Sequence, residues 1–340
     1  MTTLENTPSR LGWLEAAGGH REIGLALGRQ GRRAVHERLM ATPLWQEVTA
    51  VRHVPLVRHL LAATTERFPW VAEELTGLAE GLGLPLEMVA AWNCRGDLLA
   101  SVPDGCTTLV LPGKAPQIAH NEDGLPCLDG ACFLAQLRPA GQPALLTFCY
   151  PGSLPGHTFS LNAAGLVVTI NNLRLTGVTP ELPRMVLSRA LLAQRDLAAA
   201  LALLEATPRG AGFHYTLAQA GHAELLSVEV GGGGFSCRRL SAPALHANHG
   251  LDLDLPQVIT DSSWDRQCRG EALIAAGERD PLALLRDTGG PGLPIYRREP
   301  DDPDQENTLA TALFYLTPEG VAWQVAVPGE AGIRRGVGLG

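Results

Sequence analysis

The sequence contains no long uncharged apolar run and no cluster of basic residues. No segment approaches the roughly 18 apolar residues that predict a membrane-spanning helix, so no membrane span is expected. The net charge is −8 at pH 7, and Arg297 and Arg298 stand alone beside an acidic run. This balance argues against nucleic acid or an anionic membrane as the main partner. The N-terminus MTTLENTPSRLGWLEAAGG lacks a basic start followed by an apolar core, so no signal peptide is expected.

Cysteine is present, but without the pattern of a disulfide framework or a zinc site. The seven cysteines are odd in number, their spacing does not repeat, and C-x-x-C does not occur. Reduced thiols in a cytoplasmic protein are therefore expected, and a structural zinc site is not. Asp252 and Asp254 are more typical of a solvated edge than of a metal site, and the glycines at 231–234 lack the lysine of a phosphate-binding loop. We therefore expect neither a metal nor another cofactor.

The order of the sequence patterns predicts one catalytic domain with an N-terminal helical segment. Apolar residues make up 45% and charged residues 18% of the chain, and neither a repeat nor a linker is visible. Residues 10 to about 101 predict helices, two more helices precede Pro208, and others begin near Ser262 and Asp280. Strands are predicted at 107–111, 133–137, 144–148, 166–170, 213–219, 223–230, 244–248, 309–316 and 321–327, and an acidic surface loop at 299–307. Hairpins dominate and helices come in blocks, which favours antiparallel sheets with helical layers outside.

Cys106 stands where the helical third of the chain meets the first strand, after the turn residues Pro103, Asp104 and Gly105. A glycine before a thiol removes the side chain that would crowd attack on the preceding carbonyl. A thiol on such a turn can reach that carbonyl, which is the geometry of an N-to-S acyl shift. Taken alone, the pattern favours an ordinary buried cysteine in a strand.

Several short motifs accompany Cys106 in a fixed order. They are GHREIGLALG (19–28), EELTGLAEGLGLPLEMVAAWNCR (73–95), DGCT (104–107), HNED (120–123), NAAGLVVTINNL (162–173), HANH (246–249) and SSWDR (262–266). With these motifs the chain, from about Gly19 to Gly332, resembles the acyl-coenzyme A:6-aminopenicillanic acid acyltransferase family. That family belongs to the choloylglycine-hydrolase-like group of N-terminal nucleophile enzymes, and HNED resembles its Asn–aromatic–Asp turn.

The resemblance implies a fold and a maturation step. The implied fold is α+β, a four-layer αββα sandwich of two antiparallel sheets between helical layers. The implied maturation is self-cleavage between Gly105 and Cys106, into a helical segment 1–105 and a catalytic chain 106–340 that stay associated in one integrated domain. A self-cleaved heterodimer is therefore expected, and it could assemble further into a homo-oligomer.

The resemblance also implies the chemistry. Cys106 would be the nucleophile and its freed α-amine the general base, because an α-amine titrates near neutrality, at about 7.7–8.0. The enzyme would hydrolyse or form a linear amide through an acyl-thioester. The expected substrate is a small N-acyl amide, and the acyl group could pass to water, to an amine or between coenzyme A and an amine. The resemblance does not choose among these acceptors.

The remaining site residues follow from the same motifs. Asp123 would orient the freed amine, Asn248 would donate to the tetrahedral oxyanion, and Arg266 would favour the thiolate. A second oxyanion donor would come from Asn171 or Asn172; the two point to opposite sides of a strand, and both assignments stay open. A carboxylate in a turn, a polar strand end and a solvated arginine are the ordinary alternatives for these residue types.

The chain departs from the family pattern beside the nucleophile. Glu122 replaces an aromatic or apolar residue, and His120 stands where relatives carry arginine or glutamine, so both are expected to affect substrate binding. Two other functions compete with the leading one. A conventional Cys–His hydrolase without self-cleavage could use His246 or His249, which flank Asn248, and a non-catalytic binding protein could use the same scaffold.

Overall fold

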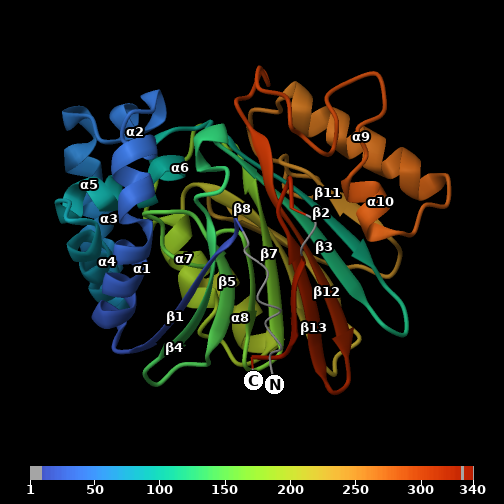
Figure 1. Cartoon of the computed structure of the whole chain (residues 1–340), viewed down its shortest axis with the longest axis horizontal. Coiled ribbons are helices and arrows are strands. Elements are labelled where there is room, and N and C mark those ends of the chain that lie inside the picture. Colours follow the sequence, from blue (N-terminus) through green and yellow to red (C-terminus); the bar gives the residue numbers. More distant parts are fainter. Residues whose placement is uncertain (1–9, 331–332, 340) are drawn as a thin grey trace.

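Two β-sheets lie face to face between helical layers in the computed structural model, which describes residues 10–330 and 333–339. Figure 1 shows helices α1 to α7 on the outer side of one sheet and α9 and α10 beside the other. The predicted α+β sandwich with antiparallel sheets is thereby confirmed. Residues 1–9, on which the signal-peptide expectation chiefly depends, and Gly332, at the end of the family resemblance, lie outside the described residues.

The larger sheet has eight strands in the order β1-β4-β5-β6-β7-β8-β9-β10. Its strands are β1 (Gly12–Gly18), β4 (Phe133–Pro139), β5 (Leu145–Cys149), β6 (Phe159–Asn162), β7 (Leu166–Leu173), β8 (Gly212–Gln219), β9 (Leu225–Gly231) and β10 (Gly234–Arg239). All neighbours pair antiparallel except β1 and β4, which run parallel. The N-terminal segment therefore contributes a strand to the main sheet as well as its helices.

The smaller sheet has six strands in the order β11-β2-β3-β12-β13-β14. They are β11 (Ala244–His246), β2 (Asp104–Leu111), β3 (Gln117–Gly124), β12 (Asn307–Thr317), β13 (Gly320–Ala326) and β14 (Ile333–Val337). Strands β2 and β3 are buried almost throughout, because the larger sheet covers one face and helix α10 packs on the other. Polar side chains on these two strands must therefore find partners inside the protein.

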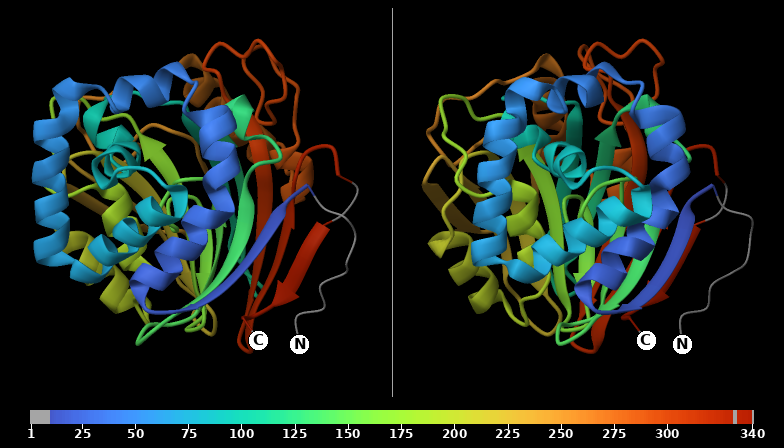
Figure 2. Two further views of the ribbon diagram at one scale, coloured as in Figure 1. Left: turned by 60° about the vertical axis from the view of Figure 1, so that its left-hand side comes forward. Right: turned by 90° about the vertical axis from the view of Figure 1, so that its left-hand side faces the viewer.

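The helices form two groups. The N-terminal group is α1 (His20–Ala34), α2 (Pro43–Val48), α3 (Val54–Arg67), α4 (Pro69–Leu82), α5 (Leu86–Asn93) and α6 (Arg95–Leu98); α7 (Arg184–Leu191) and α8 (Leu197–Ala206) join it on the large sheet. Figure 2 shows this layer from its outer side. The second group is α9 (Asp261–Ala275) and α10 (Pro281–Leu285). No helix in the described ranges is long and apolar enough to cross a membrane.

Glycines allow α1 and α4 to approach closely. A Cβ atom at Gly24 would lie 2.0 Å from the Glu74 carbonyl oxygen, and one at Gly77 would lie 2.0 Å from the Arg21 carbonyl oxygen. Side chains at these positions would therefore force the helices apart. The glycine spacing in the two N-terminal motifs thus encodes a helix–helix contact.

Three sequence predictions were wrong. Residues 12–18 form β1 instead of helix, because their partner is β4, more than 110 residues away. His120 to Asp123 lie within β3 and not in a turn, because hydrogen bonds to β2 and β12 hold them extended. The chain also has a further strand, β14, beyond the two that were expected to close it.

Candidate active site

Cys106 lies near the start of β2, in the interior of the smaller sheet, with β11 on one side and β3 on the other. Its side chain is only 3% exposed. Burial, followed by the neighbouring Glu122 carboxyl group, raises the pKa of the Cys106 thiol well above its usual range, and Arg266 acts in the opposite direction. In the uncut chain the thiol is therefore protonated at neutral pH.

Asn248 and Arg266 converge on the backbone of Cys106. The Cys106 N–H donates to Oδ1 of Asn248 over 2.9 Å, and Nη1 of Arg266 donates to the Cys106 carbonyl over 2.5 Å. Arg266 also donates to Oδ1 of Asn248 at 2.6 Å, and its Nε donates to Ser262 at 3.0 Å. Arg266 is fully buried, so it is not a solvated helix residue. In this arrangement Asn248 presents an acceptor to Cys106, and its amide group donates to the Asn172 carbonyl at 3.2 Å.

Asp123 faces Gly105 across the β2–β3 ladder, one position before Cys106. It is fully buried, and neither carboxylate oxygen makes a geometrically acceptable hydrogen bond to a described residue, although the Thr308 hydroxyl lies near. Burial raises the pKa of Asp123, while Arg266 and Arg297 oppose the shift. Two unused acceptors beside the Gly105–Cys106 bond leave room for a new donor there.

A buried charge network beside Gly105 was missed by the sequence analysis. Glu306 accepts from Arg174 at 2.8 Å and from Arg297 at 2.5 Å, and Arg297 also pairs with Asp302. Burial raises the pKa of Glu306 to about 7, although both arginines act against the shift. The segment 299–307 was expected to be an acidic surface loop, and residues 299–305 are exposed or half-buried as expected. The end of the segment differs, because Glu306 is buried and pairs with Arg297.

Glu122 and His120 contact the thiol side of Cys106. Oε2 of Glu122 lies 3.6 Å from the Cys106 sulfur and 3.1 Å from Nε2 of His120, and Tyr150 donates to Oε1 at 2.6 Å. Burial lowers the pKa of His120 to about 3. The atoms of Cys106, His120 and Glu122 that could bind a metal lie within 4.8 Å of one another. Direct hydrogen bonds among these side chains account for that spacing, so we assign no metal to them. Tyr150 carried no sequence signal, because no motif includes it.

Asn171 and Asn172 point to opposite faces of β7. Asn171 faces the smaller sheet, where Oδ1 accepts from Thr108 at 2.7 Å and Nδ2 donates to the His246 carbonyl at 3.0 Å. Asn172 faces the helical side, where Oδ1 accepts from Arg184 at 2.5 Å. Its Nδ2 is buried without a hydrogen-bond partner among the described residues. Of the two amides, Asn172 is thus the one whose Nδ2 makes no hydrogen bond to a described residue.

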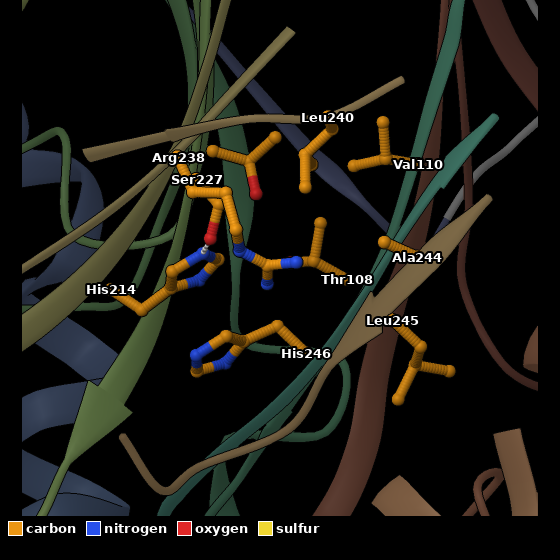
Figure 3. Close-up of a pocket in the computed structure, with 10 residues that line it drawn as sticks. Thr108, Val110, His214, Ser227, Arg238, Leu240, Ala244, Leu245 and His246 are labelled. Carbon is orange, nitrogen blue, oxygen red and sulfur yellow. Dashed lines mark hydrogen bonds between the residues drawn. The ribbon is translucent and has the colours of Figure 1, made fainter. Parts of the chain in front are cut away.

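The two histidines that flank Asn248 are engaged elsewhere. His246 pairs with Glu229 at 2.9 Å, and His249 contacts the Ser263 hydroxyl at 2.8 Å. Figure 3 shows His214 and His246 among the residues that line a cavity between the sheets, with His214 bonded to Ser227. The volume of this cavity is only about 10 Å³. Neither flanking histidine is bonded to the thiol; its direct neighbour is the Glu122 carboxyl group, with His120 bonded to that group.

A larger, mostly apolar cavity opens near the segment that precedes Cys106. Its volume is about 410 Å³. It is lined by Thr42, Pro43, Leu44, Glu47, Pro103, Leu125, Pro126, Cys127 and Gln305. The N-terminal helices, the Pro103 turn and the acidic loop all contribute to its wall, so the cavity exists only in the assembled fold.

Two sheets between helical layers, with a buried cysteine at the start of a central strand, are the fold and site expected of the N-terminal nucleophile enzymes. Residues 110–330 match the family described as acyl-coenzyme A:6-aminopenicillanic acid acyl-transferase. The match covers more than half of the chain, so the protein belongs to this family. The predicted family, one of hydrolases and acyltransferases, is thereby confirmed.

Two relatives match nearly the full length. The chain is 22% identical to a beta-alanyl-dopamine/carcinine hydrolase of Drosophila melanogaster, over 93% of each chain. It is 25% identical to the 40 kDa form of an acyl-coenzyme A:6-aminopenicillanic-acid-acyltransferase of Emericella nidulans, over 92% of this chain and 88% of the relative. A solved mutant of a conjugated bile acid hydrolase from Clostridium perfringens aligns at 12% identity and a TM-score of 0.42, over 68% of this chain and 92% of that one. The last likeness is too distant to add to the argument.

Proposed function

We propose that the protein is a self-cleaving amidohydrolase or acyltransferase whose nucleophile is Cys106. The observation that carries the proposal is the meeting of Asn248 and Arg266 on the Cys106 backbone, directly after Gly105. Attack of the thiol on the Gly105 carbonyl gives a thioester with loss of the Cys106 amide bond. Water then hydrolyses the thioester, which releases the Gly105 carboxylate and leaves Cys106 with a free amine and a free thiol.

The new amine would supply the base that the uncut chain lacks. An amide nitrogen is not basic, whereas an α-amine can take the thiol proton near neutral pH. The two free oxygens of Asp123 lie beside this bond and would accept from the amine. Asn248 Nδ2 carries two hydrogens and donates one of them to the Asn172 carbonyl, so the second would be the donor to an oxyanion. The unused Nδ2 of Asn172 supports Asn172 over Asn171 as the second donor.

The cut chains would stay together as a heterodimer. Strand β1 pairs with β4 across the cleavage point, so one sheet contains both pieces. Arg189 of the second piece also forms a buried bidentate pair with Glu74 of the first, at 2.8 and 2.9 Å. These contacts link residues 1–105 to residues 106–340. The seven free cysteines support the proposed cytoplasmic location.

The substrate we propose is a small N-acyl amide with an apolar part. The cavity of about 410 Å³ would hold that part, since most of its lining residues are apolar. His120 and Glu122 would lie beside the acyl group on the sulfur. The named relatives act on a beta-alanyl amide or transfer an acyl group to 6-aminopenicillanic acid, which supports a small amide substrate.

The test is N-terminal sequencing and intact mass of the purified protein, followed by a screen of N-acyl substrates. We expect two chains, with one beginning at Cys106. Cys106→Ala should give one folded, inactive chain, and Cys106→Ser slow or partial cleavage, because a hydroxyl is the weaker nucleophile. Exposed Cys237→Ala is the control and should cleave normally. A wild-type chain that is fully active while uncut would contradict the proposal.

A further inference from the structure

A chain of hydrogen bonds runs between the two sheets, and the Asn171 side chain fixes which atom donates in each bond. Its Nδ2 donates to the His246 carbonyl, so its Oδ1 is the atom that faces Thr108 at 2.7 Å and Nδ1 of His214 at 3.1 Å. An amide oxygen can only accept, so the single hydroxyl hydrogen of Thr108 points to Asn171. The 2.8 Å contact between Thr108 and Nδ1 of His120 must then be donated by the histidine.

The same assignment of donors and acceptors determines which group carries the hydrogen between His120 and Glu122. The His120 ring is neutral, because burial lowers its pKa to about 3, so its one hydrogen is on Nδ1 and Nε2 is an acceptor. Nε2 lies 3.1 Å from Oε2 of Glu122. Two acceptors do not form a hydrogen bond, so the hydrogen in this contact belongs to the carboxyl group. Tyr150 donates to the other carboxyl oxygen at 2.6 Å, which leaves Oε2 as the protonated oxygen.

The surroundings of Glu122 agree with a neutral acid. The ionisable groups that face it are Cys106 and Asp104 from β2, His120 and Asp123 from β3, Tyr150 after β5, and Cys132 before β4. Among the described residues none of these facing groups is a cation at neutral pH. Burial raises the pKa of Glu122 well above its usual range, Asp104 and Asp123 act in the same direction, and the Tyr150 hydroxyl acts against it.

We propose that Glu122 is a neutral carboxylic acid whose hydroxyl hydrogen is held by His120 at rest and is turned to the Cys106 sulfur when the thiolate forms. The inference rests on the proposed function of Cys106. A glutamate carboxylate 3.6 Å from the sulfur would repel a thiolate, whereas the acid can donate to it from the same oxygen. No covalent bond breaks in this movement, because the hydrogen stays on Glu122 and only its hydrogen-bond acceptor changes from His120 to the sulfur. His120 is a positioning residue that acts through Glu122.

A vibrational spectrum tests the protonation directly, without catalysis. In full-length Cys106→Ala protein, the carbonyl stretch of a buried carboxylic acid should be present, and Glu122→Gln in that background should remove it. His120→Phe should keep the band and shift its frequency, because the acid loses its acceptor. Asp97 and Glu306, whose pKa values burial raises to about 7, also contribute to this region, so the difference between the two proteins is the test. A carbonyl region at neutral pH that Glu122→Gln leaves unchanged would overturn the inference.

Stability gives a matched comparison in the same background. Glutamine copies a neutral acid in shape and charge, so Glu122→Gln should shift the melting temperature little. Glu74 is equally buried, but its pKa is lowered against the burial cost by Arg189 and His20. Glu74→Gln should therefore lower the melting temperature strongly, because Arg189 loses its counter-charge. If Glu122→Gln lowers the melting temperature as much as Glu74→Gln does, the inference is overturned.

Cleavage kinetics test the role toward the thiolate. In chains synthesised cell-free and sampled over time, Glu122→Gln keeps a donor beside the sulfur and should lose any decline in cleavage at alkaline pH. Glu122→Met has no donor, so it should cleave about ten- to a hundredfold more slowly than Glu122→Gln, as for a lost hydrogen bond to a charged group. Equal slowing in both variants would overturn the role. A wild-type chain that is neither cut nor active would instead refute the proposed function. If the wild-type chain is cut and active but Glu122→Gln leaves the infrared spectrum of the Cys106→Ala protein unchanged, only this inference is refuted.

Discussion

Glu306 occupies the space beside Gly105 that a side chain there would need. A Cβ atom built on Gly105 would lie 2.2 Å from Oε2 of Glu306 and 3.3 Å from Cβ of Asp123. Arg174 and Arg297 hold Glu306 in this position, so it has little freedom to move away. The glycine before Cys106 is therefore required by packing as well as by access to its carbonyl.

Gly105→Ala should consequently destabilise the chain and slow its self-cleavage. We expect a loss of about 1–3 kcal/mol in the free energy of unfolding, the usual cost of overpacking a tight site. Chemical denaturation and the rate of appearance of the two chains measure the two effects. Gly289→Ala is the control, because the nearest atom to a Cβ there is the end of the long Arg269 side chain at 3.0 Å. Normal cleavage by Gly105→Ala would show that Glu306 yields easily.

Arg266→Lys should reduce both self-cleavage and substrate turnover. Arg266 donates to the Cys106 carbonyl, to Thr107, to Asn248 and to Ser262, and a lysine cannot span these four acceptors. We expect a loss of about a hundredfold or more in kcat, as when a preorganised donor is removed. Arg269→Lys on the same helix is the matched control, since its partner is Asp287. Equal kinetics for the two variants would contradict the assigned contacts.

Leu44→Arg should weaken substrate binding and leave self-cleavage unchanged. Leu44 lines the cavity that we assign to the apolar part of the substrate, and neither Cys106 nor Arg266 is among the lining residues of that cavity. Loss of one buried leucine contact predicts a rise in KM of about tenfold. Val51→Arg, on the neighbouring turn and 85% exposed, is the control. A rise in KM for the control but not for Leu44→Arg would move the substrate away from this cavity.

Asp97→Asn should remove part of the pH dependence of stability. Burial raises the pKa of Asp97 from its ordinary 3.8 to about 7, although Arg184 acts against the shift. Between these pH values the folded chain binds the proton and the unfolded chain does not. The stabilisation from this group is therefore full below about pH 4 and is lost as the pH rises through about 7.

The measurement is urea denaturation of full-length Cys106→Ala protein at a series of pH values. The wild-type carboxyl should account for a decline of at most roughly 4 kcal/mol over this window, and Asp97→Asn should flatten it. Asp254→Asn, at an exposed position, serves as the control and should leave the curve unchanged. A curve for Asp97→Asn that is as steep as the wild type would exclude this assignment.

The residues closest to the Cys106 backbone could be proposed from the sequence because each lies in a short motif that resembles one of the family. Gly105-Cys106 follows turn residues, and Arg266 lies one turn into a helix that Thr260 caps through its side chain. Asp196 likewise caps α8 as predicted. Such patterns act over four or five neighbouring residues, so the chain encodes them without its tertiary partners. The layer order also followed from the sequence, since blocks of helices and hairpins leave few ways to bury their apolar faces.

Only the tertiary structure could determine which distant groups share the interior. Whether Asn171 or Asn172 faces the smaller sheet depends on how β7 packs against β2, and an alternating pattern is satisfied by either choice. The acidic loop at 299–307 looks solvated in sequence, but Arg297 and Arg174 draw Glu306 inside. The hydrogen on Glu122 depends on contacts that run through His120 and Thr108 to Asn171 on the other sheet. Protonation and burial are properties of these surroundings, and the surroundings exist only once residues far apart in the chain have packed together.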